Sequence, residues 1–122
     1  MLLFKGLCNM KYLNRSGITV FKTTAFLQWV RHNHPNLAHW DLSSLNHHPN
    51  VYLFDLEDQN CWGNCFEEHF NKIFQHEIED FIRHEFEYPN DVTFESHNTW
   101  LSFEYAELVC DLSNQHLKVY DD

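Results

Sequence analysis

The stretch CFEEHFNKIFQHEIEDFIRHEF, residues 65–86, decides how this chain folds. Its apolar residues recur every three or four positions, which is the spacing of one face of an amphipathic helix. They are Phe66, Phe70, Ile73, Phe74, Ile78, Phe81 and Ile82. Asn64 is a favoured N-cap, Glu67 can complete a capping box, and Pro89 ends the run. The pattern predicts a helix over about residues 65–86.

Two carboxylates, Glu77 and Glu85, fall inside or at the edge of this apolar stripe. A carboxylate in such a place is unfavourable unless it is paired or hydrogen-bonded. One interpretation is an internal ion pair with a basic residue of the N-terminal part of the chain. The other is an exposed groove beside the helix in which a Lys or Arg of a partner docks. The opposite face is polar, as solvation predicts, with Glu68, Lys72, Gln75, Glu79 and Arg83.

Shorter elements surround the long helix. β-Branched and alternating runs predict strands at 2–8, 17–21, 50–56 (a buried strand), 102–112 and 116–120. Short helices are predicted at 23–33, with Thr23 or Thr24 as N-cap, and at 93–101, capped by Thr93. The stretch 34–50 reads as a loop anchored by Trp40, Leu42 and Leu45. We therefore expect one α+β domain over residues 1–122, a small, mainly antiparallel sheet with the helices packed on it.

The charge of the chain is distributed unevenly. Residues 1–50 hold five basic and one acidic residue, whereas residues 51–122 hold three basic and seventeen acidic ones. Nucleic acid and anionic membranes need a basic face, so neither is expected as a partner. An acidic field favours a cationic protein partner, although it also serves solubility alone. No secretory signal or membrane span is recognisable, which predicts a cytoplasmic protein.

Cysteine and histidine side chains are the candidate metal or redox ligands of this chain. Cys61 and Cys65 are spaced C-x-x-x-C, whereas redox pairs and zinc knuckles mostly use C-x-x-C. Gly63 and Asn64 read as the turn and cap of the helix, which would separate Cys61 from the face that holds Cys65 and His69. None of the ten histidines lies in an H-E-x-x-H motif, and no G-x-S-x-G occurs. We expect no cofactor, no metal and no enzyme activity.

The acidic positions along and after the long helix form the candidate interface, with aromatic residues among them. Aromatic side chains amid charge suit an interface hot spot. The candidate residues are Glu77, Glu79, Asp80, Glu85, Glu87, Tyr88, Asp91, Glu95, Trp100 and Glu104.

Three segments of the C-terminal half resemble a known family. They are EIEDFIRHEFEYP (77–89), FESHNTWLSFEY (94–105) and LVCDL (108–112). The positions that carry the likeness are Glu77, Ile78, Glu79, Phe81, Tyr88, Pro89, Phe94, Trp100, Leu101, Val109, Asp111 and Leu112. They resemble small bacterial immunity proteins of polymorphic-toxin and contact-dependent-inhibition systems, in particular immunity protein 41. Phe81 stands where that pattern has a Trp.

The resemblance implies a non-enzymatic protein that binds and blocks the C-terminal toxin domain of a cognate secreted protein, often a nuclease. A basic nuclease would bind the acidic part of this chain. The protein itself is expected to be a monomer or weak dimer. Two alternatives stay open. One is an acidic nucleic-acid mimic or phage-type inhibitor of a DNA- or RNA-binding protein. The other is a metal-binding protein that uses the cysteines and histidines.

Overall fold

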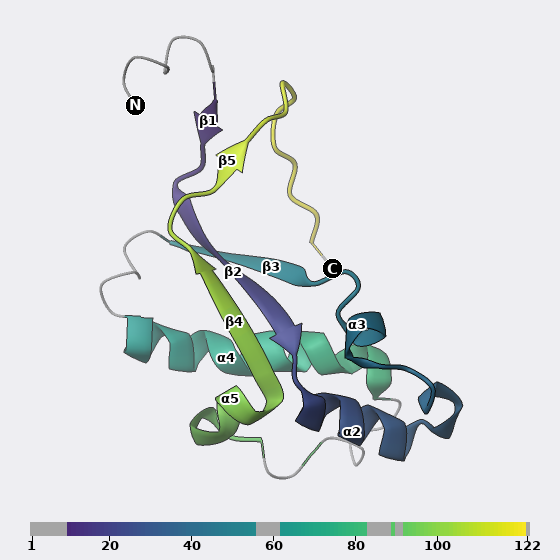
Figure 1. Ribbon diagram of the computed structural model, residues 1–122. Helices are drawn as coiled ribbons and strands as arrows, with labels where there is room; N and C mark the ends of the chain where they lie inside the picture. The colour runs from purple at the N-terminus through teal and green to yellow at the C-terminus, as the bar shows by residue number, and fades with distance from the viewer. Residues whose placement is uncertain (1–9, 56–61, 83–88, 90–91, 122) are drawn as a thin grey trace.

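A three-stranded antiparallel sheet forms the centre of the molecule. The computed structural model describes residues 10–55, 62–82, 89 and 92–121, without the side chains of 62–65. Strand β2 (Arg15–Lys22) lies between β3 (Asn50–Asp55) and β4 (Leu101–Ala106), as Figure 1 shows. Ile18 pairs with Tyr52 on one side and Tyr105 on the other, which sets the register of the whole sheet. The predicted α+β class is confirmed.

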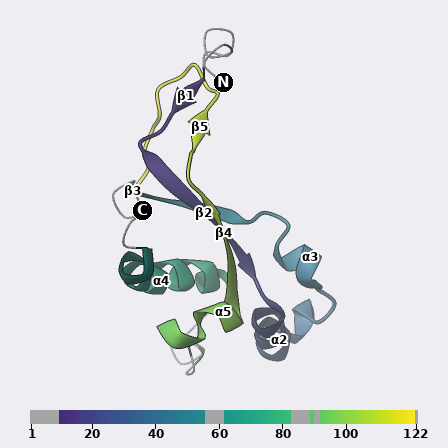
Figure 2. The same cartoon turned by 60° about the vertical axis from the view of Figure 1, so that its left-hand side comes forward.

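The segments that precede β2 and follow β4 extend beyond the sheet as a narrow arm. Strand β1 (Lys11–Tyr12) pairs antiparallel with β5 (Cys110–Asp111), and the amide of Leu13 donates to the carbonyl of Val109 at 2.8 Å. Figures 1 and 2 show this arm standing away from the helices. The strand predicted at 102–112 is therefore interrupted between β4 and β5. No strand forms at 116–120, and the strand predicted at 2–8 lies outside the described residues.

Helix α4 (Trp62–Ile78) packs on one face of the sheet and continues as a 3-10 turn, η3 (Glu79–Phe81). The Phe66 ring lies 4.9 Å from that of Phe103 on β4, centroid to centroid. The predicted apolar stripe is confirmed from Phe66 to Ile78. Its residues are buried, and they are Phe66, Phe70, Ile73, Phe74 and Ile78. The bounds were wrong at both ends. The helix begins before Asn64, which is no cap, and it gives way to the 3-10 turn after Ile78.

Helix α2 (Thr24–Asn33) follows β2 directly and begins as predicted at Thr23, whose side chain accepts a hydrogen bond from the amide of Phe26. Phe26 is fully buried between helices, with its ring 6.2 Å from Phe74 and 6.3 Å from Trp100. The segment after it is not a plain loop, since it contains η1 (Pro35–Leu37) and α3 (Leu42–Leu45). Leu45 is buried as predicted, Trp40 is partly buried and Leu42 is exposed.

A short helical pair leads into β4. It consists of η5 (Phe94–Ser96) and α5 (His97–Trp100). Thr93 caps it as predicted, and Ser96 returns a hydrogen bond to complete a capping box. The ring of His97 stacks on that of Phe94 at 4.7 Å, beside the aromatic residues of α4. This pair closes the end of the core where Trp100 and Leu101 are buried.

Strand β3 is an edge strand, and the prediction of a buried strand was wrong. It pairs with β2 along one side and with no described strand along the other, and Phe54 is its one buried residue. Val51 and Leu53 are 60% and 46% exposed, because they point to the sheet face opposite α4. The sheet is thus covered on one face and open on the other.

Candidate functional site

The most unusual side chain in the core is Glu77, in the last turn of α4. It is 3% exposed and follows Phe70, Ile73 and Phe74 at helical spacing, so it points at the sheet among apolar neighbours. A carboxylate in this place is strongly unfavourable unless donors surround it. The surroundings of Glu77 are therefore the leading candidate for a functional site.

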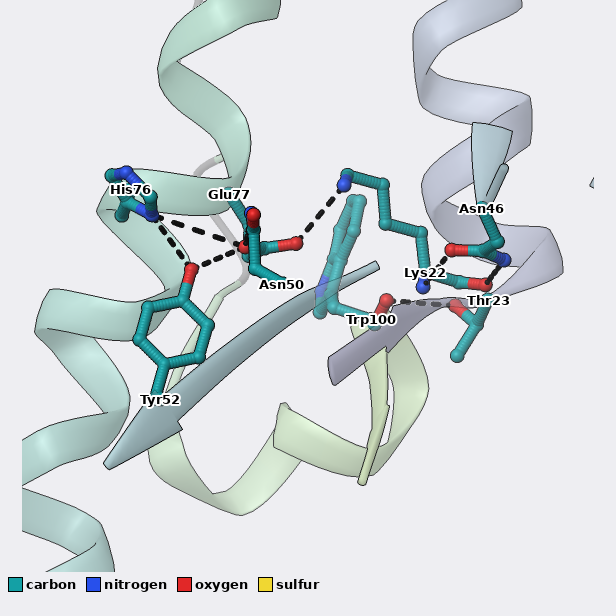
Figure 3. A network of polar contacts seen from close by, with 8 residues as sticks. All are labelled: Lys22, Thr23, Asn46, Asn50, Tyr52, His76, Glu77 and Trp100. Carbon is teal, nitrogen blue, oxygen red and sulfur yellow. Dashed lines mark hydrogen bonds and ion pairs between the residues drawn. The ribbon is translucent and has the colours of Figure 1, made fainter. Parts of the chain in front are cut away.

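Three donors from the sheet reach the Glu77 carboxylate, as Figure 3 shows. The Lys22 ammonium lies 3.0 Å from Oε1, and the Asn50 side-chain amide donates to Oε2 at 2.7 Å. The Tyr52 hydroxyl also donates to Oε2. Lys22 ends β2, while Asn50 and Tyr52 lie on β3, all on the covered face of the sheet. The network therefore joins α4 to two strands through one charged group.

The pKa values follow from these contacts. Burial by itself raises the pKa of Glu77, but hydrogen bonds from Tyr52 and Asn50 and the charge of Lys22 outweigh it and hold that pKa below the ordinary value. Burial and the neighbouring carboxylate raise the pKa of Tyr52. At neutral pH Glu77 is therefore ionised and Tyr52 is protonated. Neither is placed to exchange a proton in a reaction at that pH.

His76 connects the network to solvent. Its Nδ1 lies 2.7 Å from the Tyr52 hydroxyl, and its side chain is 51% exposed. A tyrosine hydroxyl has one proton, and Tyr52 donates that proton in its hydrogen bond to the ionised carboxylate of Glu77. The hydrogen bond between His76 and Tyr52 then requires the proton on Nδ1 of His76. The network thus fixes both the orientation and the tautomer of an exposed imidazole.

Backbone contacts hold Lys22 in place. The Asn46 side chain accepts from the Lys22 amide at 2.7 Å and donates to its carbonyl at 2.8 Å. Next to it, the Thr23 hydroxyl lies 3.0 Å from the carbonyl of Trp100. These bonds tie the end of β2 to α3 and α5. This arrangement can hold α4 on the sheet and position His76.

The candidate residues predicted from sequence fall into three groups. Glu77 is buried, and the predicted internal ion pair is confirmed, with Lys22 as the partner. Trp100 is 6% exposed and belongs to the core. The exposed ones are Glu79, Asp80, Glu95 and Glu104, whereas Glu85, Glu87, Tyr88 and Asp91 lie outside the described residues.

The exposed candidates do not share one surface. Glu79 and Asp80 lie on η3, at the C-terminal end of α4. Glu95 follows Phe94, whose ring contacts Phe66 in the N-terminal half of α4. Glu104 pairs with Thr19 in the sheet, so strand alternation directs it to the open face, away from α4. The described, exposed members of the candidate interface thus lie in separate places.

The structure describes only part of the cysteine motif. Cys61 and the side chain of Cys65 lie outside what the structure describes. Because α4 begins at Trp62, Gly63 and Asn64 are helical, and the predicted turn between the two cysteines was wrong. Over the described ranges no three His, Cys, Asp or Glu side chains converge in a way that could hold a metal ion.

Sequence reasoning missed Lys22, Asn50, Tyr52 and His76 as partners of Glu77. The position of Glu77 in the stripe predicted that some donor must reach it, but nothing local identified which one. Comparison with known proteins adds no guide: no protein-family model, curated protein or solved structure matches this chain. Among the helices in the described ranges, none has both the length and the apolar character to cross a bilayer.

Proposed function

We propose that this protein is an immunity protein that binds and neutralises a basic toxin domain, a nuclease released by a contact-dependent or polymorphic toxin. The proposal places it in the cytoplasm, where it would meet the toxin. The observation that supports it best is an excess of exposed carboxylates that have no Lys or Arg within ion-pair distance in the described part of the chain. Such an excess extends an acidic field into solvent, where it steers a cationic protein toward the surface.

The described part of the chain contains two ion pairs between Lys or Arg and a carboxylate. One is the Lys22–Glu77 pair, and the other joins Arg15 to Asp55 at 3.6 Å on the surface. Nine further exposed carboxylates have no described Lys or Arg within ion-pair distance. They are Asp41, Glu67, Glu68, Glu79, Asp80, Glu95, Glu104, Glu107 and Asp121. Their charge is therefore available to a partner.

The open face of the sheet offers apolar anchors beside one of these carboxylates. A Cβ placed on Gly17 would lie 3.3 Å from Val109 Cγ2, 3.6 Å from Leu53 Cδ2 and 3.6 Å from Val51 Cγ1. These three side chains therefore converge over the glycine. Glu104 and Val51 both pair with Thr19, so they flank it on the same face. An apolar centre with an acidic rim has the usual anatomy of a protein interface.

The experiment is co-expression with the C-terminal domain of whichever large secreted protein is encoded beside this gene, with host survival as the readout. Rescue is expected. Glu104→Lys should weaken it, whereas Glu68→Lys, the same change of charge on the outer face of α4, should not. The pair Glu79→Lys with Asp80→Lys tests the 3-10 turn separately. Glu77→Lys is unsuitable because it would bury a second ammonium beside Lys22 and unfold the protein.

Binding of the purified proteins should weaken as salt rises, because screening reduces the field between exposed charges. Failure to rescue, with toxicity of the domain verified, would contradict the proposal. Rescue that both Glu104→Lys and the Glu79–Asp80 double change leave intact would keep the function and contradict these surfaces. Binding to an unrelated DNA-binding protein instead would favour the acidic mimic.

A further inference from the structure

A cleft of about 350 Å³ opens between β3 and α4. Ile18, Phe54, Phe66 and Ile73 line it, and each of these residues is at most 8% exposed in the folded chain. The cleft is at the small end of the range of ligand pockets, roughly 300–1,000 Å³, and such pockets are mostly apolar with a few placed polar groups. Its floor therefore suits an apolar group of modest size.

Besides the Tyr52 hydroxyl on β3, the polar side chains of the cleft come from one face of α4. They are His69, Lys72 and His76, at helical spacings of three and four. No described lining residue is a carboxylate, although the chain as a whole carries a net charge of −10. Lys72 has no described carboxylate within ion-pair distance. Among the described residues the rim therefore carries one ammonium, that of Lys72, and no carboxylate.

One rim group is held rigidly. His76 is fixed by Tyr52, which also lines the cleft and is itself held by Glu77 (Figure 3). The buried network therefore positions the edge of the cleft as well as joining α4 to the sheet. An imidazole whose orientation is fixed before a ligand arrives loses less freedom on binding.

We propose that this cleft binds a small amphipathic carboxylate: an apolar chain or ring on the floor, with its carboxylate at Lys72 beside His76. The apolar floor disfavours a purely polar anion such as phosphate, which would leave that surface uncovered. The ammonium of Lys72 disfavours a cation, and a neutral ligand would gain nothing from it. The site is separate from the open sheet face, so it does not depend on the immunity function.

The test uses octanoate as the probe and octanamide as its uncharged control. Isothermal titration calorimetry gives both affinities, and methyl NMR spectra report contact with Ile18 and Ile73. Octanoate is expected to bind, and octanamide about tenfold more weakly, equivalent to about 1.4 kcal/mol. Lys72→Gln should reduce octanoate affinity to that of octanamide. Lys118→Gln, which removes an exposed lysine of the C-terminal segment, should leave it unchanged.

Three results would overturn the proposal. The first is no heat and no methyl shift with octanoate at millimolar concentration. The second is equal affinity for octanoate and octanamide, which would mean that the rim does not select charge. The third is binding that shifts other methyl groups while leaving those of Ile18 and Ile73 in place. Since Lys72 is exposed, Lys72→Gln leaves the fold intact, and unfolding does not confuse the result.

Discussion

The ammonium of Lys22 and the carboxylate of Glu77 meet 3.0 Å apart, with side-chain exposures of 13% and 0%. They belong to a strand and a helix that are separated by 55 residues in the chain. The attraction between two such charges is offset by the free energy of removing both from water. Their arrangement is thus more sensitive to the loss of one partner than to the loss of both.

The first prediction concerns that asymmetry. Glu77→Gln should lower the free energy of unfolding by about 3–5 kcal/mol, because it leaves the Lys22 ammonium withdrawn from water without an anion. Adding Lys22→Met should restore part of the loss, with a coupling energy of roughly 0.5–3 kcal/mol. Urea unfolding of the wild type, both single variants and the double variant measures this cycle. Strictly additive losses would contradict it.

Stability should depend on the ionisation of Glu77. Its pKa in the folded state lies below the ordinary value of 4.5, so its contribution is complete above that value. The contribution is lost as the pH falls through the folded-state pKa, because protonation removes the charge that Lys22 pairs with. The difference in unfolding free energy between wild type and Glu77→Gln should therefore shrink as the pH falls below the ordinary value of 4.5 and through the lower folded-state pKa. A difference independent of pH would show that the charge of Glu77 is not responsible.

Tyr52→Phe removes the hydroxyl that donates to Glu77 and accepts from His76. A hydrogen bond to a charged group contributes roughly 1.5–3 kcal/mol, and the loss of unfolding free energy should fall in this range. Tyr120→Phe is the matched control, since Tyr120 is 85% exposed. The NMR signals of the His76 ring should also shift in Tyr52→Phe. Equal stability of the two variants would argue against the network.

Thr23 has two tasks at the junction of β2 and α2, since it caps the helix and contacts the carbonyl of Trp100. Thr23→Ala should therefore cost about 1–2 kcal/mol of unfolding free energy. Thr24→Ala, one residue later and exposed, provides the control and should change it little. Chemical denaturation of both variants and the wild type measures these differences in unfolding free energy. A loss as large in Thr24→Ala would mean that the cap is not what stabilises the junction.

Local patterns predicted those parts of the fold that are held by local rules. The stripe from Phe66 to Ile78 and the caps at Thr23 and Thr93 arise from helical periodicity and from backbone donors near each cap, and all three were found as predicted. Gly63 and Asn64 misled because their turn propensity is weak compared with continuing a helix of 17 residues that packs on a sheet.

Features that depend on topology could not be read in this way. The run from Val51 to Phe54 looks buried, but its exposure is decided by its place at the edge of the sheet. The alternating segment 116–120 has strand character, but it pairs with no strand in the described part of the chain. For the site, the stripe predicted that Glu77 needs a partner. The choice of Lys22 depends on a sheet register that no local pattern encodes.

The order of pairing in the sheet sets a condition on how the protein is made. The Ser16 hydroxyl donates to the carbonyl of Glu107, 91 residues later, and β2 has β4 as its second neighbour along its length. A chain emerging from the ribosome therefore cannot complete the sheet until β4, residues 101–106, has been synthesised. Until then β2 lacks the second strand that pairs with Gly17 to Lys22. Folding that depends on such distant contacts is slow, and the nascent chain is prone to aggregation during synthesis.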